Sequence, residues 1–222
     1  MPGAAREVVL AYLVERIVGV DVGHPTRVAV DGPDMAGKTT LAAELALRLE
    51  SIGRDVIRAS ADDFHRPRRE RYRRGRESPE GYYLDAFDVD QLASVLLVPL
   101  GPGGDRLYAT AVFDHRTDAV VRQQPRVAPG DAVLLVDGVF LLRPELHGQW
   151  DLSIFVRASP RERLARSMIR DLDHADSAEE LERFFWKRYA PAHELYRRRV
   201  DPEALADLVV DNERPVAPRL RG

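Results

Sequence analysis

Residues 27–40 read Arg27-Val28-Ala29-Val30-Asp31-Gly32-Pro33-Asp34-Met35-Ala36-Gly37-Lys38-Thr39-Thr40. The apolar residues 28–30 predict a short buried strand that ends at Gly32. After the loop, residues 38–50 place apolar side chains at helical spacing. The sequence therefore predicts a strand, a glycine-containing loop and a helix in direct succession.

The loop matches the pattern G-x-x-x-x-G-K-[ST] at residues 32–39. Glycines allow consecutive backbone N–H groups to face an anion, and the helix N-terminus adds positive potential. Lys38 can reach the terminal phosphates of a nucleotide, and the Thr39 hydroxyl can ligate Mg²⁺. We expect ATP to bind at Gly32, Pro33, Asp34, Met35, Ala36, Gly37, Lys38, Thr39 and Thr40, with Mg²⁺ as the metal.

Lysine is rare in this chain, which has 33 basic residues but lysine only at positions 38 and 187. The guanine-binding motif of GTPases, Asn-Lys-x-Asp, is therefore absent from the sequence. A carboxylate on the Mg²⁺ side of the site is predicted at Asp137. This residue follows the apolar residues 133–136, and a carboxylate in such a place needs a cation or hydrogen bonds. The alternative is that Asp137 only caps a turn.

Predicted strands alternate with predicted helices along the chain, which favours an α/β fold with a parallel sheet covered on both faces. We expect a single P-loop NTPase domain over residues 1–222 with a helical lid. Within it we expect an N-terminal helix in residues 1–22, a polar flap at 62–81 beside the acceptor, and the lid with its following helices at 160–200. An antiparallel excursion is predicted from residues 107–113 and 118–128. The flap is expected to be a polar, arginine-dense loop. A helix is expected over 88–97, with Asp88 or Asp90 as its N-cap, and a long helical stretch from Ala178 is expected to be interrupted at Pro191.

The 222 residues carry a net charge of −3 and include no cysteine, which excludes disulfide scaffolds and thiolate metal sites. A net acidic chain gives no reason to expect nucleic acid as a partner. No apolar run approaches the length of a membrane span, so we expect a cytoplasmic protein with no membrane partner. Whether it forms a homo-oligomer is left open.

Two adjacent acids, Asp62 and Asp63, follow the second predicted strand. The carboxyl ends of parallel strands face the ligand crevice, so these acids are expected opposite the phosphate loop. One of them is a candidate base for an acceptor hydroxyl and a metal contact. The alternative is that both are solvated acids that balance the arginines after them.

At this point the sequence resembles the uridine kinase family of P-loop kinases, whose Ser-x-Asp-x-Phe-Tyr segment is matched by Ser60-Ala61-Asp62-Asp63-Phe64-His65. The resemblance implies that Asp62 is the catalytic base and that His65 stacks on a base. Other family segments are matched by Leu84-Asp85-Ala86-Phe87-Asp88 and by Phe113-Asp114-His115-Arg116. The substrate-binding candidates are therefore Asp63, His65, Tyr82, Tyr83, Asp85, Phe113, Asp114, His115 and Arg116.

The family's lid helix is matched by residues 163–171, with Arg163, Arg166 and Arg170 on one helical face. The catalytic candidates are thus Lys38, Asp62, Arg166 and Arg170. The two lid arginines are included because their guanidiniums can neutralise charge on a triphosphate. The alternative is a solvated face that pairs with Glu162 and Asp171.

The sequence departs from the family on the acceptor side. Tyr82 stands where the family has an acid that holds ribose hydroxyls, and Asp173, His174 and Asp176 stand where a pyrimidine-reading arginine is expected. Asp34 occupies the phosphate loop, where it would repel a nucleotide unless it points at a hydroxyl or a cation. The run from Arg66 to Arg76 holds seven arginines and suits a solvated flap or an anionic acceptor group.

The sequence therefore predicts an ATP- and Mg²⁺-dependent kinase acting on a hydroxyl of a small molecule, with uridine or cytidine implied by the resemblance. The alternatives are another acceptor (nicotinamide riboside, pantothenate or a nucleoside monophosphate) and a regulatory protein that only binds or hydrolyses ATP.

Overall fold

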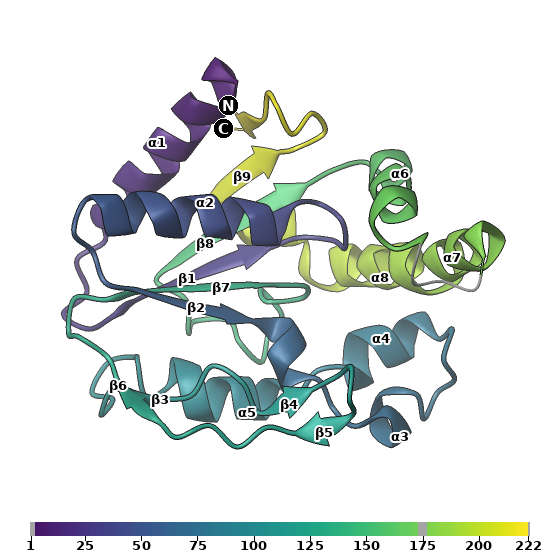
Figure 1. The fold of residues 1–222 in the computed structure, drawn as a ribbon, viewed down its shortest axis with the longest axis horizontal. Coiled ribbons are helices and arrows are strands. Elements are labelled where there is room, and N and C mark those ends of the chain that lie inside the picture. The colour runs from purple at the N-terminus through teal and green to yellow at the C-terminus, as the bar shows by residue number, and fades with distance from the viewer. Residues whose placement is uncertain (1–2, 173–176, 222) are drawn as a thin grey trace.

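The computed structural model describes residues 3–172 and 177–221. Its centre is a six-stranded sheet in the order β10-β9-β8-β1-β7-β2, in which only the edge strand β10 runs antiparallel (Figure 1). This is the predicted α/β fold of a P-loop NTPase. The strands of this sheet are β1 (Thr26–Asp31), β2 (Val56–Ser60), β7 (Val133–Gly138), β8 (Leu152–Arg157), β9 (Leu208–Asp211) and β10 (Arg219–Arg221).

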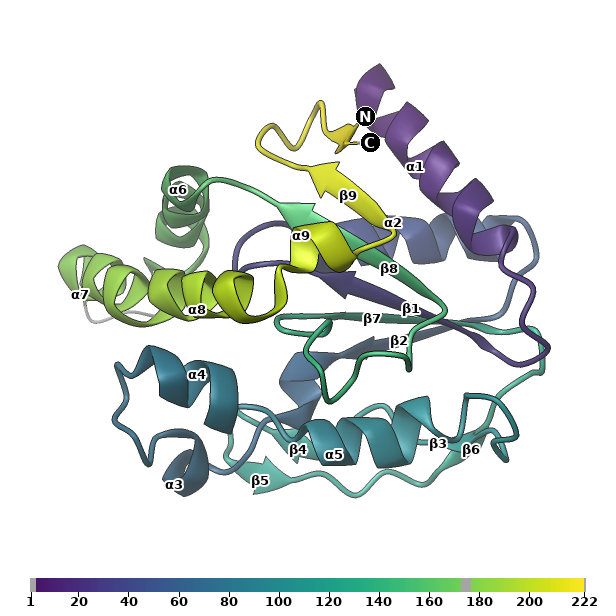
Figure 2. The same cartoon turned by 180° about the vertical axis from the view of Figure 1, so that it is seen from behind.

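Side chains on the central strands alternate between two cores, one on each face of the sheet. On one face Val28 and Val30 pack with the helices α1 (Ala4–Val18) and α2 (Lys38–Ser51). On the other face Ala29 packs with α4 (Pro79–Asp85), α5 (Val89–Leu92) and α8 (Ala190–Val200). Figure 2 shows this second face, with α4 beside α8. The prediction that helices cover both faces is confirmed.

The register of the parallel strands brings three chain segments to one edge of the sheet. Asp31 of β1 is level with Gly138 of β7, and Ser60 of β2 is level with Asp137. The phosphate loop, the residues after β2 and the end of β7 therefore meet at the carboxyl edge, as expected for a ligand crevice.

The flap at 62–81, which the sequence analysis described as a polar loop, contains helical turns. They are the 3₁₀-helix η1 (Ala61–Phe64), the helix α3 (Arg68–Arg71) and the start of α4. Side-chain caps account for two of them, because Ser60 accepts a hydrogen bond from the Asp62 N–H and Ser78 from the Gly81 N–H. The prediction of a loop without regular structure was therefore wrong.

The helices after β8 are α6 (Pro160–Arg170), α7 (Ala178–Phe184), the π-helix η4 (Phe185–Tyr189) and α8. The helical run does not break at Pro191: α7, η4 and α8 are continuous, and the π-helix η4 ends just before Pro191. Asp173, His174 and Asp176, which the sequence analysis noted, lie outside the described residues.

The remaining elements connect β2 to β7 and complete the second face. Asp88 caps α5 by accepting from the Gln91 N–H, as predicted, and α5 continues as the π-helix η2 (Ala93–Leu97). The predicted antiparallel excursion is confirmed as two small sheets, which pair β3 (Leu107–Tyr108) with β6 (Arg126–Val127), and β4 (Phe113–Asp114) with β5 (Ala119–Val120). After α8 the short helix α9 (Pro202–Leu205) leads into β9. In the part of the chain that the structure describes, no helix is long and apolar enough to cross a membrane.

Candidate active site

The phosphate loop folds tightly against the end of β8. Gly32 has φ 149°, and a Cβ there would lie 2.2 Å from the carbonyl oxygen of Val156. Gly37 has φ 99° at the start of α2, and a Cβ there would lie 2.5 Å from Nδ2 of Asn212. Both positions therefore require glycine, which lets the loop turn its backbone N–H groups inward.

Lys38 is buried within this loop, and its Nζ donates a hydrogen bond to the Pro33 carbonyl at 2.9 Å. Burial lowers the pKa of Lys38, and the neighbouring carboxylates of Asp34 and Asp31 oppose that shift. The loop thus has the glycine-dependent turn and the ammonium group that a nucleoside triphosphate requires, and ATP fits the residues present.

Oxygen ligands suited to Mg²⁺ stand beside Lys38. Thr39 Oγ1 donates to Asp137 Oδ2 at 2.6 Å, and Asp137 is almost fully buried. The other oxygen of Asp137 accepts from Arg58 Nη2 at 2.9 Å, a partner that the sequence analysis missed. A hydroxyl and carboxylates are hard donors of the kind that Mg²⁺ binds together with substrate phosphates and water. The residues present therefore fit the metal.

Asp31, the last residue of β1, is fully buried behind the loop. It accepts hydrogen bonds from the Tyr196 hydroxyl at 2.6 Å and from the Gly32 N–H at 2.7 Å. Burial raises the pKa of the Asp31 carboxyl. These bonds tie the start of the loop to α8, across the second core.

Asp34 points away from the loop amides, toward the neighbouring cavity. Its Oδ1 accepts from the Tyr82 hydroxyl at 2.8 Å, and its Oδ2 lies 2.9 Å from Nε2 of His193. Burial alone would raise the pKa of Asp34, but the hydrogen bonds and the positive neighbours His193 and Lys38 hold it well below its usual range. The two departures from the family pattern, Asp34 and Tyr82, are therefore direct partners.

Two cavities meet at Asp62. The first, here the P-loop cavity, has about 280 Å³ and is lined by the loop, Asp137 and the lid arginines. The second, here the arginine cavity, has about 640 Å³ and lies between the flap and η4. Its lining residues are Asp34, Asp62, His65, Arg68, Arg71, Tyr72, Arg76, Tyr82, His115, Arg170, Arg188 and Tyr189. Asp62 lines both cavities and has an exposed side chain.

The structure brings several predicted acceptor residues into the arginine cavity. The His65 ring lies 4.4 Å from the Phe87 ring and 4.9 Å from the His115 ring, measured between centroids. Burial lowers the pKa of His65, although the Asp62 carboxylate opposes the shift. The His65 and His115 rings form part of the cavity wall, which Asp62 also lines.

Other predicted acceptor residues do not line this cavity. Asp85 is buried and forms ion pairs with Arg73 and Arg74 of the flap. Tyr83 and Phe113 are buried in the protein interior, and Asp114 and Arg116 form a turn closed by an Arg116 N–H to Asp114 hydrogen bond of 2.9 Å. Asp63 also lies outside the cavity lining; burial and the Asp62 charge raise its pKa.

The three lid arginines on α6 have different surroundings. Arg163 is buried over the Phe185 ring, 5.3 Å from its centroid. Arg166 donates to the carbonyls of Met35 and Ala36 at 3.2 and 3.3 Å, so it holds the loop backbone. Arg170 is exposed and forms an ion pair with Asp171 at 2.6 Å. Of these three arginines, only Arg170 lines both the P-loop cavity and the arginine cavity.

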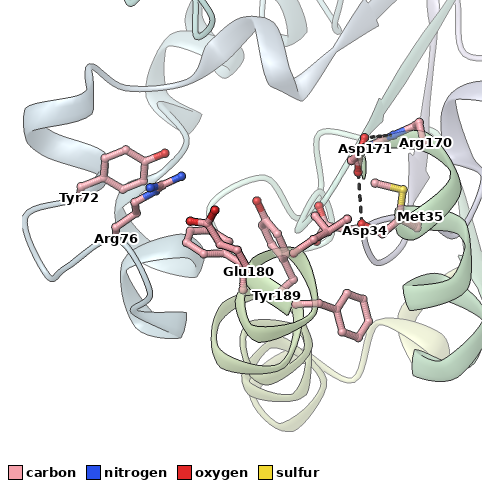
Figure 3. A pocket seen from close by; sticks show the side chains of 12 residues that line it. Asp34, Met35, Tyr72, Arg76, Arg170, Asp171, Glu180 and Tyr189 are labelled. Atoms are coloured by element: carbon pink, nitrogen blue, oxygen red, sulfur yellow. Dashed lines mark hydrogen bonds and ion pairs between the residues drawn. The ribbon is translucent and has the colours of Figure 1, made fainter. Parts of the chain in front are cut away.

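A third cavity of about 460 Å³, here the lid cavity, opens between the loop, α6 and α7. Figure 3 shows Tyr72 and Arg76 on one side of it and Asp34, Met35 and Arg170 on the other, with Tyr189 between. The lid cavity is adjacent to the arginine cavity. The residues that line both are Asp34, Tyr72, Arg76, Arg170 and Tyr189.

The sequence analysis missed the contribution of residues 185–193. Arg188, Tyr189 and His193 reach the site only because η4 and α8 pack beside α4. Their spacing in the sequence indicates an ordinary amphipathic helix, and no motif singles them out.

With this geometry in place, comparison with known proteins gives the family. The model of the cytidylate kinase-like family matches residues 28–214. The chain belongs to the cytidylate kinase-like family. It is also 26% identical over 155 residues to a uridine kinase of Leuconostoc citreum, covering 67% of this chain and 70% of that protein.

Two further similarities support the resemblance to uridine kinases. The chain is 31% identical over 151 residues to uridine-cytidine kinase B of Dictyostelium discoideum, covering 67% of this chain and 59% of that protein. A solved structure described as a possible uridine kinase from Bacillus stearothermophilus has the same fold, with a TM-score of 0.71 and 22% identity over 91% of this chain and 97% of the other. The predicted family resemblance is thereby confirmed.

Proposed function

We propose that this protein is a kinase that transfers the γ-phosphoryl group of Mg·ATP to a hydroxyl group of a small molecule. The observation that carries the proposal is the position of Asp62, which lines both the P-loop cavity and the arginine cavity. A group at this junction can contact an acceptor hydroxyl and stand beside the phosphate being transferred. The lines of support are the loop geometry, the Thr39–Asp137 pair and the family.

In the proposed reaction the acceptor oxygen attacks the γ-phosphorus, and the bond from that phosphorus to the β–γ bridging oxygen breaks. Asp62 accepts the proton of the acceptor hydroxyl, and ADP leaves. Lys38 and the loop amides hold the phosphates, while Arg166 keeps the loop in place and Arg170 faces the developing charge. Mg²⁺ held near Thr39 and Asp137 would supply electrostatic stabilisation of the phosphates.

The names of the relatives support uridine or cytidine as the acceptor. A second candidate acceptor is a hydroxyl compound with an anionic group, which the arginines of the second cavity favour. Asp62 can act as the base for either acceptor. The identity of the acceptor is therefore a separate question from the type of reaction.

The test is ADP release from Mg·ATP in the presence of uridine, cytidine, nicotinamide riboside, pantothenate and nucleoside monophosphates, with Lys38→Met as the blank. Asp62→Asn should lower acceptor-dependent turnover by about 10²- to 10⁴-fold, as loss of a general base does, and leave Mg·ATP affinity within about threefold. The control is Asp131→Asn, the same chemical change at an exposed residue just before β7. Turnover unchanged by Asp62→Asn would refute the base and favour a regulatory ATP-binding protein.

A further inference from the structure

The arginine cavity has an unusual charge for the acceptor side of a kinase that acts on neutral molecules. Five arginines and two histidines line it, against two aspartates. Of these aspartates, Asp34 accepts a hydrogen bond from Tyr82 and lies beside His193, and Asp62 is the proposed base. Two of the arginines have carboxylate partners, since Arg71 pairs with Asp118 and Arg170 with Asp171. Among the described residues, Arg68, Arg76 and Arg188 form no ion pair.

Arg188 is the clearest case of a cavity arginine that is buried without a carboxylate partner. It is 3% exposed, and its guanidinium lies over the rings of Tyr82 at 4.7 Å, Tyr72 at 5.2 Å and Phe184 at 5.8 Å. Its one hydrogen bond to a described residue is from Nη1 to the Arg76 carbonyl, at 2.5 Å. Among residues 3–172 and 177–221, no carboxylate lies within ion-pair distance of Arg188.

Burying a guanidinium without an anion is costly, because the charge loses its hydration and gains no opposite charge. Other buried arginines of this chain follow the usual rule, since Arg6, Arg27 and Arg143 each form an ion pair with a carboxylate. Arg163 is a further exception, but it lines none of the three cavities described above. Arg188 combines burial, a missing counter-charge and a place in the cavity wall.

The flap holds further guanidiniums toward the same space. Arg71 is buried, donates to the carbonyls of Arg66 and His115 at 3.0 and 3.1 Å, and pairs with Asp118 at 3.4 Å, which fixes its position. Arg68 and Arg76 are exposed, and the described residues offer neither of them an ion pair. By contrast Arg73 and Arg74 are used to anchor the flap on Asp85.

From these observations we infer that the acceptor carries an anionic group, a phosphate monoester or a carboxylate, which Arg188 binds with help from Arg68 and Arg76. This inference rests on the proposed kinase function and names the class of its substrate. The anionic group occupies the flap side of the cavity, and a hydroxyl of the same molecule faces Asp62. A volume of about 640 Å³ is in the range of pockets that bind metabolite-sized ligands.

The inferred reaction is the same phosphoryl transfer, to an acceptor that carries a negative charge. The hydroxyl oxygen of the anionic molecule forms the new bond to the γ-phosphorus, its proton passes to Asp62, and ADP departs with the bridging oxygen. The arginines offset the repulsion between the acceptor anion and the triphosphate, which would otherwise oppose their binding together.

The first arm of the test uses acceptor pairs that differ in the anion, assayed by ADP release: uridine with uridine 3′-monophosphate, fructose with fructose 6-phosphate, and glycerol with glycerol 3-phosphate and with D-glycerate. We expect at least one anionic member to exceed its neutral partner by 100-fold or more in kcat/KM. The phosphate and carboxylate members of the glycerol series distinguish the two anions. A neutral nucleoside preferred over every anionic acceptor would overturn the inference.

The second arm measures anion binding directly, with inorganic phosphate titrated into protein saturated with a non-hydrolysable Mg·ATP analogue. Arg188→Gln and Arg76→Gln should each weaken phosphate binding at least tenfold, whereas Arg122→Gln, at an exposed arginine outside the cavities, should not. Arg76 is exposed, so its variant tests the site even if Arg188→Gln fails to fold. Equal phosphate affinity in the wild type and the Arg76→Gln protein would overturn the inference.

The two proposals fail in different ways. Failure of the wild type to bind Mg·ATP would refute the kinase function, whatever the cavity binds. Mg·ATP binding and turnover with neutral acceptors alone would uphold the kinase and refute the anionic acceptor.

Discussion

His193 makes the stability of this protein depend on pH. The side chain is 9% exposed and lies against Asp34, and burial lowers its pKa to about 4. In the unfolded chain a histidine has a pKa of about 6.5. Between these values the unfolded chain binds a proton that the folded protein excludes, so stability falls as the pH falls, by about 1.4 kcal/mol per pH unit.

From pH 7 to pH 5 this difference removes about 2 kcal/mol of the free energy of unfolding. Asp34 adds nothing in this range, because its lowered pKa gives stability that is lost only when the pH falls below the unfolded value of about 3.9. His193→Gln keeps an amide donor for Asp34 but cannot take up a proton, so its stability should fall about 2 kcal/mol less over the same range.

The assay is urea denaturation at pH 7 and at pH 5, followed by tryptophan fluorescence, for the wild type and His193→Gln. The exposed His147 supplies the control, since His147→Gln should keep the wild-type pH dependence. Other titrating groups are common to the proteins and cancel in the comparison. If His193→Gln loses as much stability as the wild type, the reasoning about this buried imidazole is wrong.

Three other predictions concern the loop, the lid and the flap. Gly32→Ala should lower the free energy of unfolding by about 3 kcal/mol, because the added Cβ clashes with Val156. Gly53 also has a positive φ but has no atoms near its Cβ position, so Gly53→Ala should lower that free energy by only about 1 kcal/mol in the same denaturation assay. Arg166→Gln removes donors to two loop carbonyls and should weaken Mg·ATP binding about tenfold by calorimetric titration; unchanged affinity would show that the loop does not need this support. Asp85→Asn should speed trypsin cleavage within residues 66–76 about tenfold, because a charged anchor of the flap is lost, and equal cleavage rates would contradict that anchoring role.

Local patterns predicted the parts of this protein that depend on neighbouring residues in the chain. The phosphate loop was predictable because its function needs glycine, lysine and threonine at a set spacing, between an apolar strand and a helix. Asp137 was predictable because a carboxylate directly after four apolar residues needs a partner, and the structure supplies Thr39 and Arg58. Short continuous apolar runs likewise predicted most strands of the parallel sheet.

Other predictions failed where capping or packing outweighed local pattern. The flap was expected to be a loop because of its arginines, yet Ser60 and Ser78 cap helical turns in it. Pro191 was expected to break a helix, yet the helical run continues through it, with the π-helix η4 just before it. The edge strand β10 was not predicted, since a three-residue strand is defined only by its pairing with β9.

The sequence by itself determined the fold class, the nucleotide loop and the acids at the carboxyl edge of the sheet, because each is encoded within a few consecutive residues. Only the tertiary structure decided what faces the acceptor. Arg188 and His193 come from helices more than a hundred residues after the loop, and they meet Asp34 and the flap through the packing of α8 against α4. Since that packing depends on the whole second core, no local pattern could show that a buried guanidinium would lie in the cavity wall.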